Sequence, residues 1–121
     1  MKRQLLIVDD SASMRQVVSY TLQQAGYAVV EAASGQEALQ KVAASAVELI
    51  ITDLNMPGMH GLSLARAVRA QPAHKFTPIL MLTTDASPAR KAEGKAAGAT
   101  GWLVKPFVPD QLLAVLKKVL P

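Results

Sequence analysis

Five short apolar runs alternate along the chain with segments of helical periodicity. The apolar runs have the length and continuity of strands that are buried on both faces, and they cover residues 4–8, 27–30, 47–52, 78–82 and 100–104. Elsewhere apolar residues recur at the three- and four-residue spacing of amphipathic helices, over residues 14–25, 34–42, 62–68, 87–98 and 109–120. Strands that alternate with helices predict a parallel sheet with helices on both faces, which is a doubly wound α/β fold.

Local signals mark several helix ends. Ser34 and Glu37 have the spacing of a capping box, in which the two residues satisfy backbone N–H groups at a helix start. Ser87 followed by a proline is typical of another helix start, and Gly98 is placed to end that helix. Gly94 lies inside this alanine-rich helix and lowers its intrinsic propensity.

Size and composition favour one small domain. The chain has 121 residues, of which 50% are hydrophobic, so we expect a single packed domain over residues 1–121. Because the apolar runs are far shorter than a membrane span and no signal-peptide pattern is present, we expect a cytoplasmic protein without membrane insertion. The chain contains no cysteine, which excludes thiolate metal sites and is compatible with the cytosol.

The net charge of +4 is compatible with either a nucleic acid or an acidic protein as partner. The basic residues are spread along the chain, and no helix-turn-helix pattern follows the predicted sheet. We therefore expect most of these charges to be solvated and predict no direct contact with nucleic acid.

Polar residues follow four of the five apolar runs, at the point where each predicted strand ends. They are Asp9, Asp10, Asp53, Thr83 and Lys105. In a parallel sheet the carboxyl ends of the strands lie at one edge, which is where doubly wound proteins place their functional crevice. Three adjacent carboxylates repel one another, and oxygen ligands of this kind suit Mg²⁺. The pattern thus indicates a site for a divalent metal and a phosphoryl group.

Five segments at these positions resemble, in order and separation, the receiver domain of two-component response regulators. They are 8–11 (VDDS), 53–61 (DLNMPGMHG), 82–84 (LTT), 98–101 (GATG) and 105–107 (KPF). The resemblance covers the whole chain and is strongest to the stand-alone chemotaxis-type receiver. It implies a flavodoxin-like fold, with five parallel strands in the order 2-1-3-4-5 and five flanking helices.

The resemblance also implies a chemistry. Asp53 would accept a phosphoryl group from a histidine kinase or a small acyl phosphate. Asp10, Asp53 and the backbone carbonyl of Asn55 would ligate Mg²⁺, with Asp9 acting mostly through water. Lys105 would balance the charge of the phosphoryl oxygens. Such a protein is not an enzyme with a separate substrate, although it catalyses its own phosphorylation and dephosphorylation.

Receiver domains respond to phosphorylation through a conformational switch. By resemblance, Thr83 would be drawn toward the phosphoryl group, and Trp102 stands where the family usually has a tyrosine that moves inward. Asn55 and Asp85 occupy the positions that tune the lifetime of the phosphorylated state. We expect a cis peptide bond before Pro106.

A basic face is predicted beside this switch, on the fourth and fifth helices and the fifth strand. Its residues are Arg90, Lys91, Lys95, Trp102, Lys117 and Lys118. Our hypothesis is that this face binds an acidic segment of a protein target after phosphorylation. The expected partners are a sensor histidine kinase, such as a chemotaxis kinase, and a downstream target such as the flagellar motor or another regulator.

The sequence also bears on other candidate functions. A phosphorelay intermediate or phosphate sink would use the same residues, and the sequence does not separate it from a switch. A phosphatase of the haloacid dehalogenase type needs a second aspartate two residues after the nucleophile, where this chain has Asn55. A flavin-binding module needs a first loop rich in Ser, Thr and Gly, and Asp9 and Asp10 would repel its phosphate. A receiver that has lost phosphorylation is disfavoured because all five key positions are filled.

Overall fold

The computed structural model describes residues 3–56, 58–84, 87–105 and 107–120. Five strands are present in this part of the chain: β1 (Gln4–Val8), β2 (Ala28–Ala32), β3 (Leu49–Asp53), β4 (Ile79–Thr83) and β5 (Gly101–Val104). They alternate with the helices α1 (Ala12–Gln24), α2 (Gly35–Ala44), α3 (Gly61–Arg69), α4 (Pro88–Ala97) and α5 (Pro109–Val119). A short 3₁₀ turn, η1 (Pro72–His74), precedes β4.

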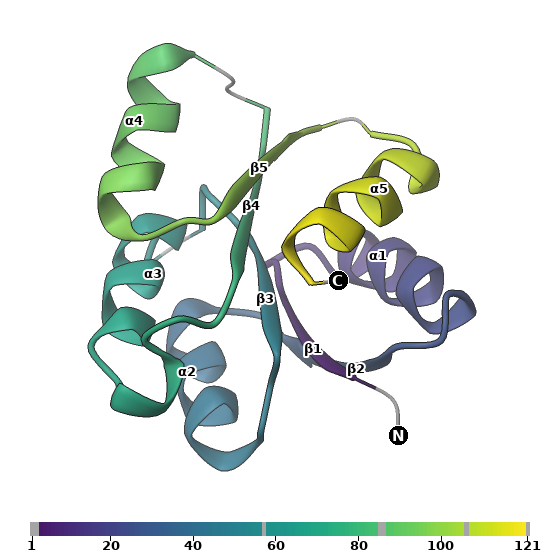
Figure 1. Ribbon diagram of the computed structural model, residues 1–121, viewed down its shortest axis with the longest axis horizontal. Coiled ribbons are helices and arrows are strands. Elements are labelled where there is room, and N and C mark those ends of the chain that lie inside the picture. Colours follow the sequence, from purple (N-terminus) through teal and green to yellow (C-terminus); the bar gives the residue numbers. More distant parts are fainter. Residues whose placement is uncertain (1–2, 57, 85–86, 106, 121) are drawn as a thin grey trace.

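The strands form one parallel sheet in the order β2-β1-β3-β4-β5. This confirms the doubly wound architecture and the strand order that the resemblance implied. Helices α2, α3 and α4 cover one face of the sheet, and α1 and α5 cover the other (Figure 1). The first and third strands are neighbours, so the loops that follow them meet at one edge of the sheet.

The core has two halves, one on each face of the sheet. Successive strand residues alternate between them: Leu6 and Val8 face α2 and α3, whereas Leu5 and Ile7 face α1 and α5. Every residue of β3 is buried. A strand that is apolar on both sides must be covered on both sides, which explains why the apolar runs show no polar alternation.

Helix starts follow the predicted caps. Ser34 Oγ accepts a hydrogen bond from Glu37 N at 3.1 Å, and Ser87 Oγ accepts from Arg90 N at 3.3 Å. Gly98 ends α4 with a φ of 105°, in the left-handed region that glycine enters without strain. The first helix begins at Ala12, two residues before the predicted start, because Ser11 caps it by accepting from Met14 N at 3.2 Å.

Strand boundaries differ modestly from the prediction. β2 extends to Ala32 because its pairing with β1 continues past the apolar run and through the exposed Glu31. β3 begins at Leu49 rather than at Val47. The turn η1 was not predicted.

No helix in the described residues combines the length and the apolar character that a membrane crossing requires.

Candidate functional site

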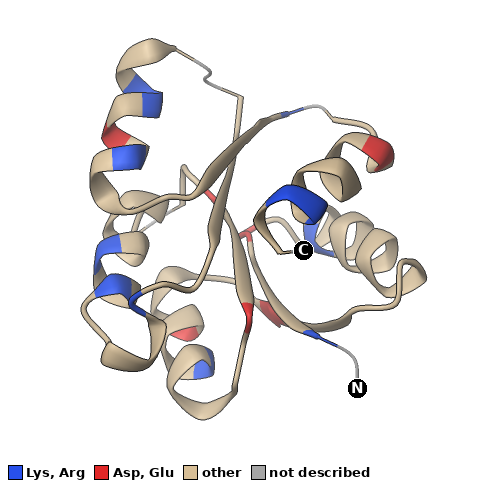
Figure 2. Ribbon diagram, in the orientation of Figure 1, with Lys and Arg blue, Asp and Glu red and all other residues tan. Residues whose placement is uncertain are grey.

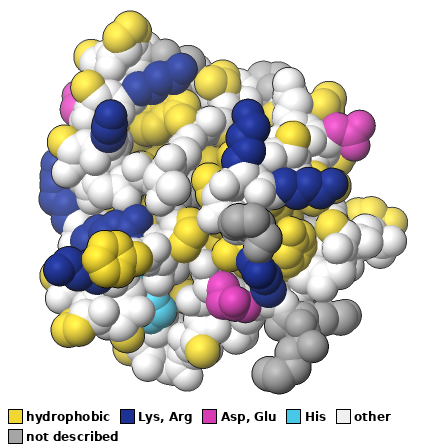
Figure 3. Space-filling model, in the orientation of Figure 1, with side chains coloured by type: hydrophobic (Ala, Val, Ile, Leu, Met, Phe, Trp, Pro, Cys, Tyr) yellow, Lys and Arg dark blue, Asp and Glu magenta, His cyan; other side chains and the backbone are white. Residues whose placement is uncertain are grey.

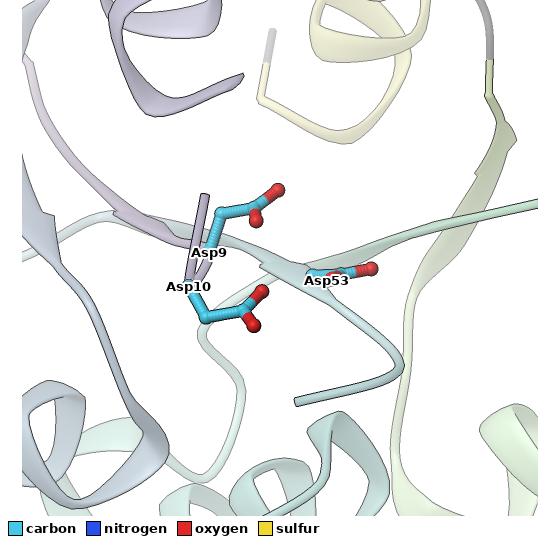
Figure 4. A group of neighbouring side chains, drawn as sticks. All are labelled: Asp9, Asp10 and Asp53. Atoms are coloured by element: carbon cyan, nitrogen blue, oxygen red, sulfur yellow. The ribbon is translucent and has the colours of Figure 1, made fainter. Parts of the chain in front are cut away.

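The five predicted polar residues meet at the carboxyl edge of the sheet. Asp9 and Asp10 follow β1, and Asp53 is the last residue of β3. Thr83 is the last residue of β4, and Lys105 follows β5. Figure 4 shows Asp9, Asp10 and Asp53 on two neighbouring strand ends with their carboxylates around one space. The strand order alone brings these residues together, because they are up to 96 positions apart in sequence.

The three carboxylates form a cluster that could hold a cation. Each offers one oxygen, and these oxygens all lie within 4.8 Å of one another. Asp9 and Asp53 are buried, whereas Asp10 is exposed at the mouth of the cluster. In the described part of the chain Asp10 makes no ion pair. A hard, oxygen-only set of this kind fits Mg²⁺, so the residues present suit the metal that the family resemblance implied.

Lys105 balances part of the negative charge. Its Nζ lies 3.2 Å from Asp9 Oδ2 and 3.3 Å from Asp53 Oδ1. All three side chains are largely buried, so the ion pairs are weakly screened by solvent. One ammonium faces three carboxylates, and the cluster therefore retains net negative charge for a divalent ion.

Asp53 has an environment that disfavours its ionised form. Burial raises the pKa of the Asp53 carboxyl, Lys105 opposes this shift, and the charge of Asp9 adds to it. The net result is a pKa above its ordinary value. A nearby cation would restore the ionised, nucleophilic form of this carboxylate.

Backbone contacts hold the acidic loop in place. Asp9 Oδ1 accepts a hydrogen bond from Ser11 N at 2.9 Å. Arg15 reaches back from α1, and its Nη1 donates to the carbonyl of Asp9 at 2.6 Å, while its Nε lies 3.2 Å from Glu31 Oε1. Arg15 could not be predicted from the sequence, since its position in the first turns of a helix carries no signal for a contact with the preceding loop.

The loop after Asp53 is fixed by close backbone packing. A Cβ added at Gly61 would lie 2.5 Å from the carbonyl oxygen of Asp53, so only glycine lets α3 start so near the strand. A Cβ added at Gly35 would lie 2.7 Å from Met59 Cβ, so the loop also packs tightly on α2. Asn55 is exposed on this loop, and its backbone opposes the rise in the pKa of the Asp53 carboxyl.

Trp102 lies inward against α4. A side chain at Gly94 would collide with the six-membered ring of Trp102, so the indole occupies the space that the glycine leaves. Trp102 pairs with Met81 of β4, two residues before the buried Thr83. Its Nε1 is buried and has no hydrogen-bond partner among the described residues. The two predicted switch residues therefore lie on adjacent strands, next to the same helix.

The structure separates Arg90 from the other residues of the predicted basic face. Lys91, Lys95 and Trp102 line a hollow of about 350 Å³ at the junction of α4 and β5. Figure 2 shows further basic residues on α5, across β5 from α4, and basic side chains border apolar surface toward the upper left of Figure 3. Arg90 instead lines a different cavity, between α3 and α4.

Two predicted features, the lifetime residue Asp85 and the cis bond at Pro106, lie outside the described residues.

The geometry agrees with comparisons to known proteins. Residues 5–117 match the family model described as "Response regulator receiver domain". The chain therefore belongs to the receiver-domain family of response regulators, which sets aside the phosphatase and flavin hypotheses.

Within this family the chain is similar to CheY proteins. It is 44% identical over 118 residues to "Chemotaxis protein CheY1" of Helicobacter pylori strain J99, covering 96% of this chain and 95% of that protein. It is 38% identical to "Chemotaxis protein CheY" of Pseudomonas aeruginosa, covering 95% and 94%. Among solved structures, "Chemotaxis response regulator CheY4 of Vibrio cholerae" superposes with a TM-score of 0.95 at 57% identity, over 99% of this chain and 100% of that one.

Proposed function

We propose that this receiver accepts a phosphoryl group on Asp53 from a histidine kinase, in a Mg²⁺-dependent reaction. The observation that carries the proposal is the contact of Lys105 Nζ with both Asp9 and Asp53, beside the exposed carboxylate of Asp10. A nucleophilic carboxylate, a buried cation and a cluster of metal-type ligands are the parts that phosphoryl transfer requires.

Each residue has a distinct part in the reaction. Asp10, Asp53 and the Asn55 carbonyl would hold Mg²⁺, with Asp9 acting mostly through water, and the ion would neutralise charge on the phosphoryl oxygens. An Asp53 oxygen forms the new bond to phosphorus as the bond from phosphorus to the histidine nitrogen breaks. The kinase imidazole leaves and takes a proton from solvent. Lys105 is placed to compensate the charge that remains on the phosphoryl oxygens.

Dephosphorylation returns the protein to its starting state. Water attacks the phosphorus of the aspartyl phosphate, which releases inorganic phosphate and regenerates the Asp53 carboxylate. The protein thus promotes two reactions of its own side chain and turns over no separate substrate. Asn55 and Asp85 would set the rate of this hydrolysis.

The output would be a change on the surface formed by α4, β5 and α5. Thr83 would move toward the phosphoryl group and free space beside Trp102 for the indole to move. The hollow lined by Lys91, Lys95 and Trp102 would then bind an acidic segment of a protein target. Because the related proteins are named as chemotaxis proteins, we place this output in chemotaxis or motility signalling in the cytoplasm, with a flagellar motor component or another regulator as target.

A phosphate sink or phosphorelay intermediate is the second candidate. It is favoured by the inward position of Trp102, whose ring already fills the space at Gly94 without phosphorylation. If the indole has no further inward movement to make, phosphorylation would change the target surface little.

The test is intact-mass analysis after incubation with acetyl phosphate, with and without Mg²⁺. We expect a phosphoryl adduct that needs Mg²⁺ and is absent from Asp53→Asn. Trp102 is the single tryptophan, so its fluorescence reports the switch in the same sample. An adduct with a fluorescence change supports the switch, and an adduct without one favours the sink. Absence of an adduct both from acetyl phosphate and from a phosphorylated kinase would contradict the proposal.

A further inference from the structure

Arg15 holds the backbone between the two aspartates that follow β1. Its guanidinium binds two groups at once, because Nη1 donates to the carbonyl oxygen of Asp9 at 2.6 Å and Nε donates to Glu31 Oε1 at 3.2 Å. That carbonyl belongs to the peptide unit that joins Asp9 to Asp10. Since a peptide unit is planar, a contact that fixes its carbonyl also fixes where the Cα of Asp10 lies.

Asp10 is the member of the carboxylate cluster for which such a contact matters most. Asp9 and Asp53 are buried, and Lys105 contacts both of them. Asp10 is exposed, so packing orients its side chain less than it orients the other two. The direction of the Asp10 carboxylate therefore depends on the backbone from which it projects.

The place of Arg15 in the helix is unfavourable for a cation. Because α1 begins at Ala12, Arg15 lies near the positive end of the helix dipole. Glu31 of the neighbouring strand β2 compensates for this, and the Arg15 side chain is only 18% exposed. A cation kept here by a carboxylate from another element is the arrangement expected of a side chain that acts through the hydrogen bond it donates.

We infer that Arg15 is a positioning residue for Mg²⁺ binding: it holds the peptide unit between Asp9 and Asp10, and Glu31 orients its guanidinium. The inference rests on the proposed function, since it takes the carboxylate cluster to be the Mg²⁺ site. Side chains that orient metal ligands from outside the ligand set typically contribute a factor of about 10–100 to metal affinity.

The charge of Arg15 has the opposite effect on a metal ion. A positive charge beside the cluster repels Mg²⁺. If charge were the only contribution of Arg15, Arg15→Gln would bind Mg²⁺ more tightly than the unsubstituted protein. If Arg15 positions Asp10, the same variant binds Mg²⁺ more weakly. The sign of the change in affinity therefore separates the two roles.

The test is a Mg²⁺ titration of the unphosphorylated protein, followed through backbone amide NMR signals, so that no phosphoryl transfer enters the measurement. We expect Arg15→Gln to raise the Kd for Mg²⁺ about tenfold. Arg15→Lys restores the charge and one donor, although not the planar fork, and should recover part of the affinity. Glutamine is a good helix former, so α1 should persist in Arg15→Gln.

A matched control removes one positive charge elsewhere. Lys75 is exposed and precedes β4, at the opposite end of the sheet from the cluster, and Lys75→Gln should not raise the Kd. An Arg15→Gln variant that binds Mg²⁺ as tightly as Lys75→Gln, or more tightly, would overturn the inference. So would an Arg15→Lys variant that binds no more tightly than Arg15→Gln. In both cases Mg²⁺ binding by the unsubstituted protein would still support the proposed function, whereas its absence would overturn the Mg²⁺ site together with the inference.

Discussion

The two sides of the carboxyl edge are built differently. At β1 and β3 the strands are buried almost completely, and Asp9 and Asp53 at their ends both contact Lys105, which reaches across from the end of β5. At β5 and α4 the packing is sparse: Val104 is 38% exposed and α4 buries only Gly94 and Ala97. A region with few buried apolar contacts opens and shifts at lower free-energy cost. We therefore call β1 and β3 the rigid side and β5 and α4 the mobile side. The comparison suggests that phosphoryl transfer takes place on the rigid side and that the conformational response takes place on the mobile side.

The largest effect should come from removing a core side chain on the rigid side. Ile51 of β3 has no exposed surface and packs between α1 and α5. Ile51→Ala should lower the free energy of unfolding by about 2–5 kcal/mol, through lost transfer energy and a cavity. Leu103→Ala on the edge strand β5, in the same half of the core, should cost less because Leu103 retains 9% exposure. Urea denaturation of both variants measures the difference, and equal losses would contradict the comparison.

Mg²⁺ binding at the rigid side should raise the free energy of unfolding by less than Ile51→Ala lowers it. A ligand that binds only the folded state at ten times its Kd adds about 1.4 kcal/mol to the free energy of unfolding. We expect this gain from Mg²⁺ in the unsubstituted protein and its loss in Asp10→Asn, which removes the exposed ligand of the cluster. Asp110→Asn serves as the control, because Asp110 lies in the first turn of α5 outside the cluster. Thermal unfolding with and without Mg²⁺ checks this, and an unchanged gain in Asp10→Asn would show that the ion binds elsewhere.

The same cluster should make stability depend on pH. Because burial raises the Asp53 pKa, the folded state holds this proton more tightly than the unfolded chain, and stability falls as pH rises from 3.8 through the folded pKa. Without metal, Asp53→Asn should therefore be more stable than the unsubstituted protein at neutral pH. The difference should shrink to nothing below pH 3.8. Denaturation at several pH values tests the sign, and a variant that is less stable at neutral pH would contradict it.

The sequence predicted the rigid side almost fully and the mobile side only in part. Asp9, Asp10, Asp53, Thr83 and Lys105 were found because each follows an apolar run, and a parallel sheet must bring such positions together. This inference needed only the strand periodicity and the family's strand order.

Features that depend on packing between helices were not predicted. The sequence indicated Trp102 only as the aromatic at the switch position and Gly94 only as a residue that lowers helix propensity, so their contact was not predicted. The assignment of Arg90 to the α3–α4 cavity depends on the rotation of α4 about its axis. Neither hydrophobic periodicity nor motif spacing determines such a fit, because both describe one element at a time.

The smallest expected change in stability, and the most specific change in response, belongs to Gly94→Ala. Alanine raises helix propensity by about 1 kcal/mol over glycine, but its Cβ collides with the Trp102 ring, so the two effects oppose each other. The indole should be displaced toward solvent, with a red shift of its fluorescence in the unphosphorylated state. Ala96→Ser, at an exposed position of the same helix, should leave the spectrum unchanged. Because the carboxylates Asp9, Asp10 and Asp53 lie at the ends of β1 and β3, acetyl phosphate should still modify Gly94→Ala at a near-normal rate, while the affinity for an acidic target peptide changes. A normal spectrum would contradict the expected displacement of the indole. Loss of phosphorylation together with the spectral shift would show that the rigid side and the mobile side do not behave separately.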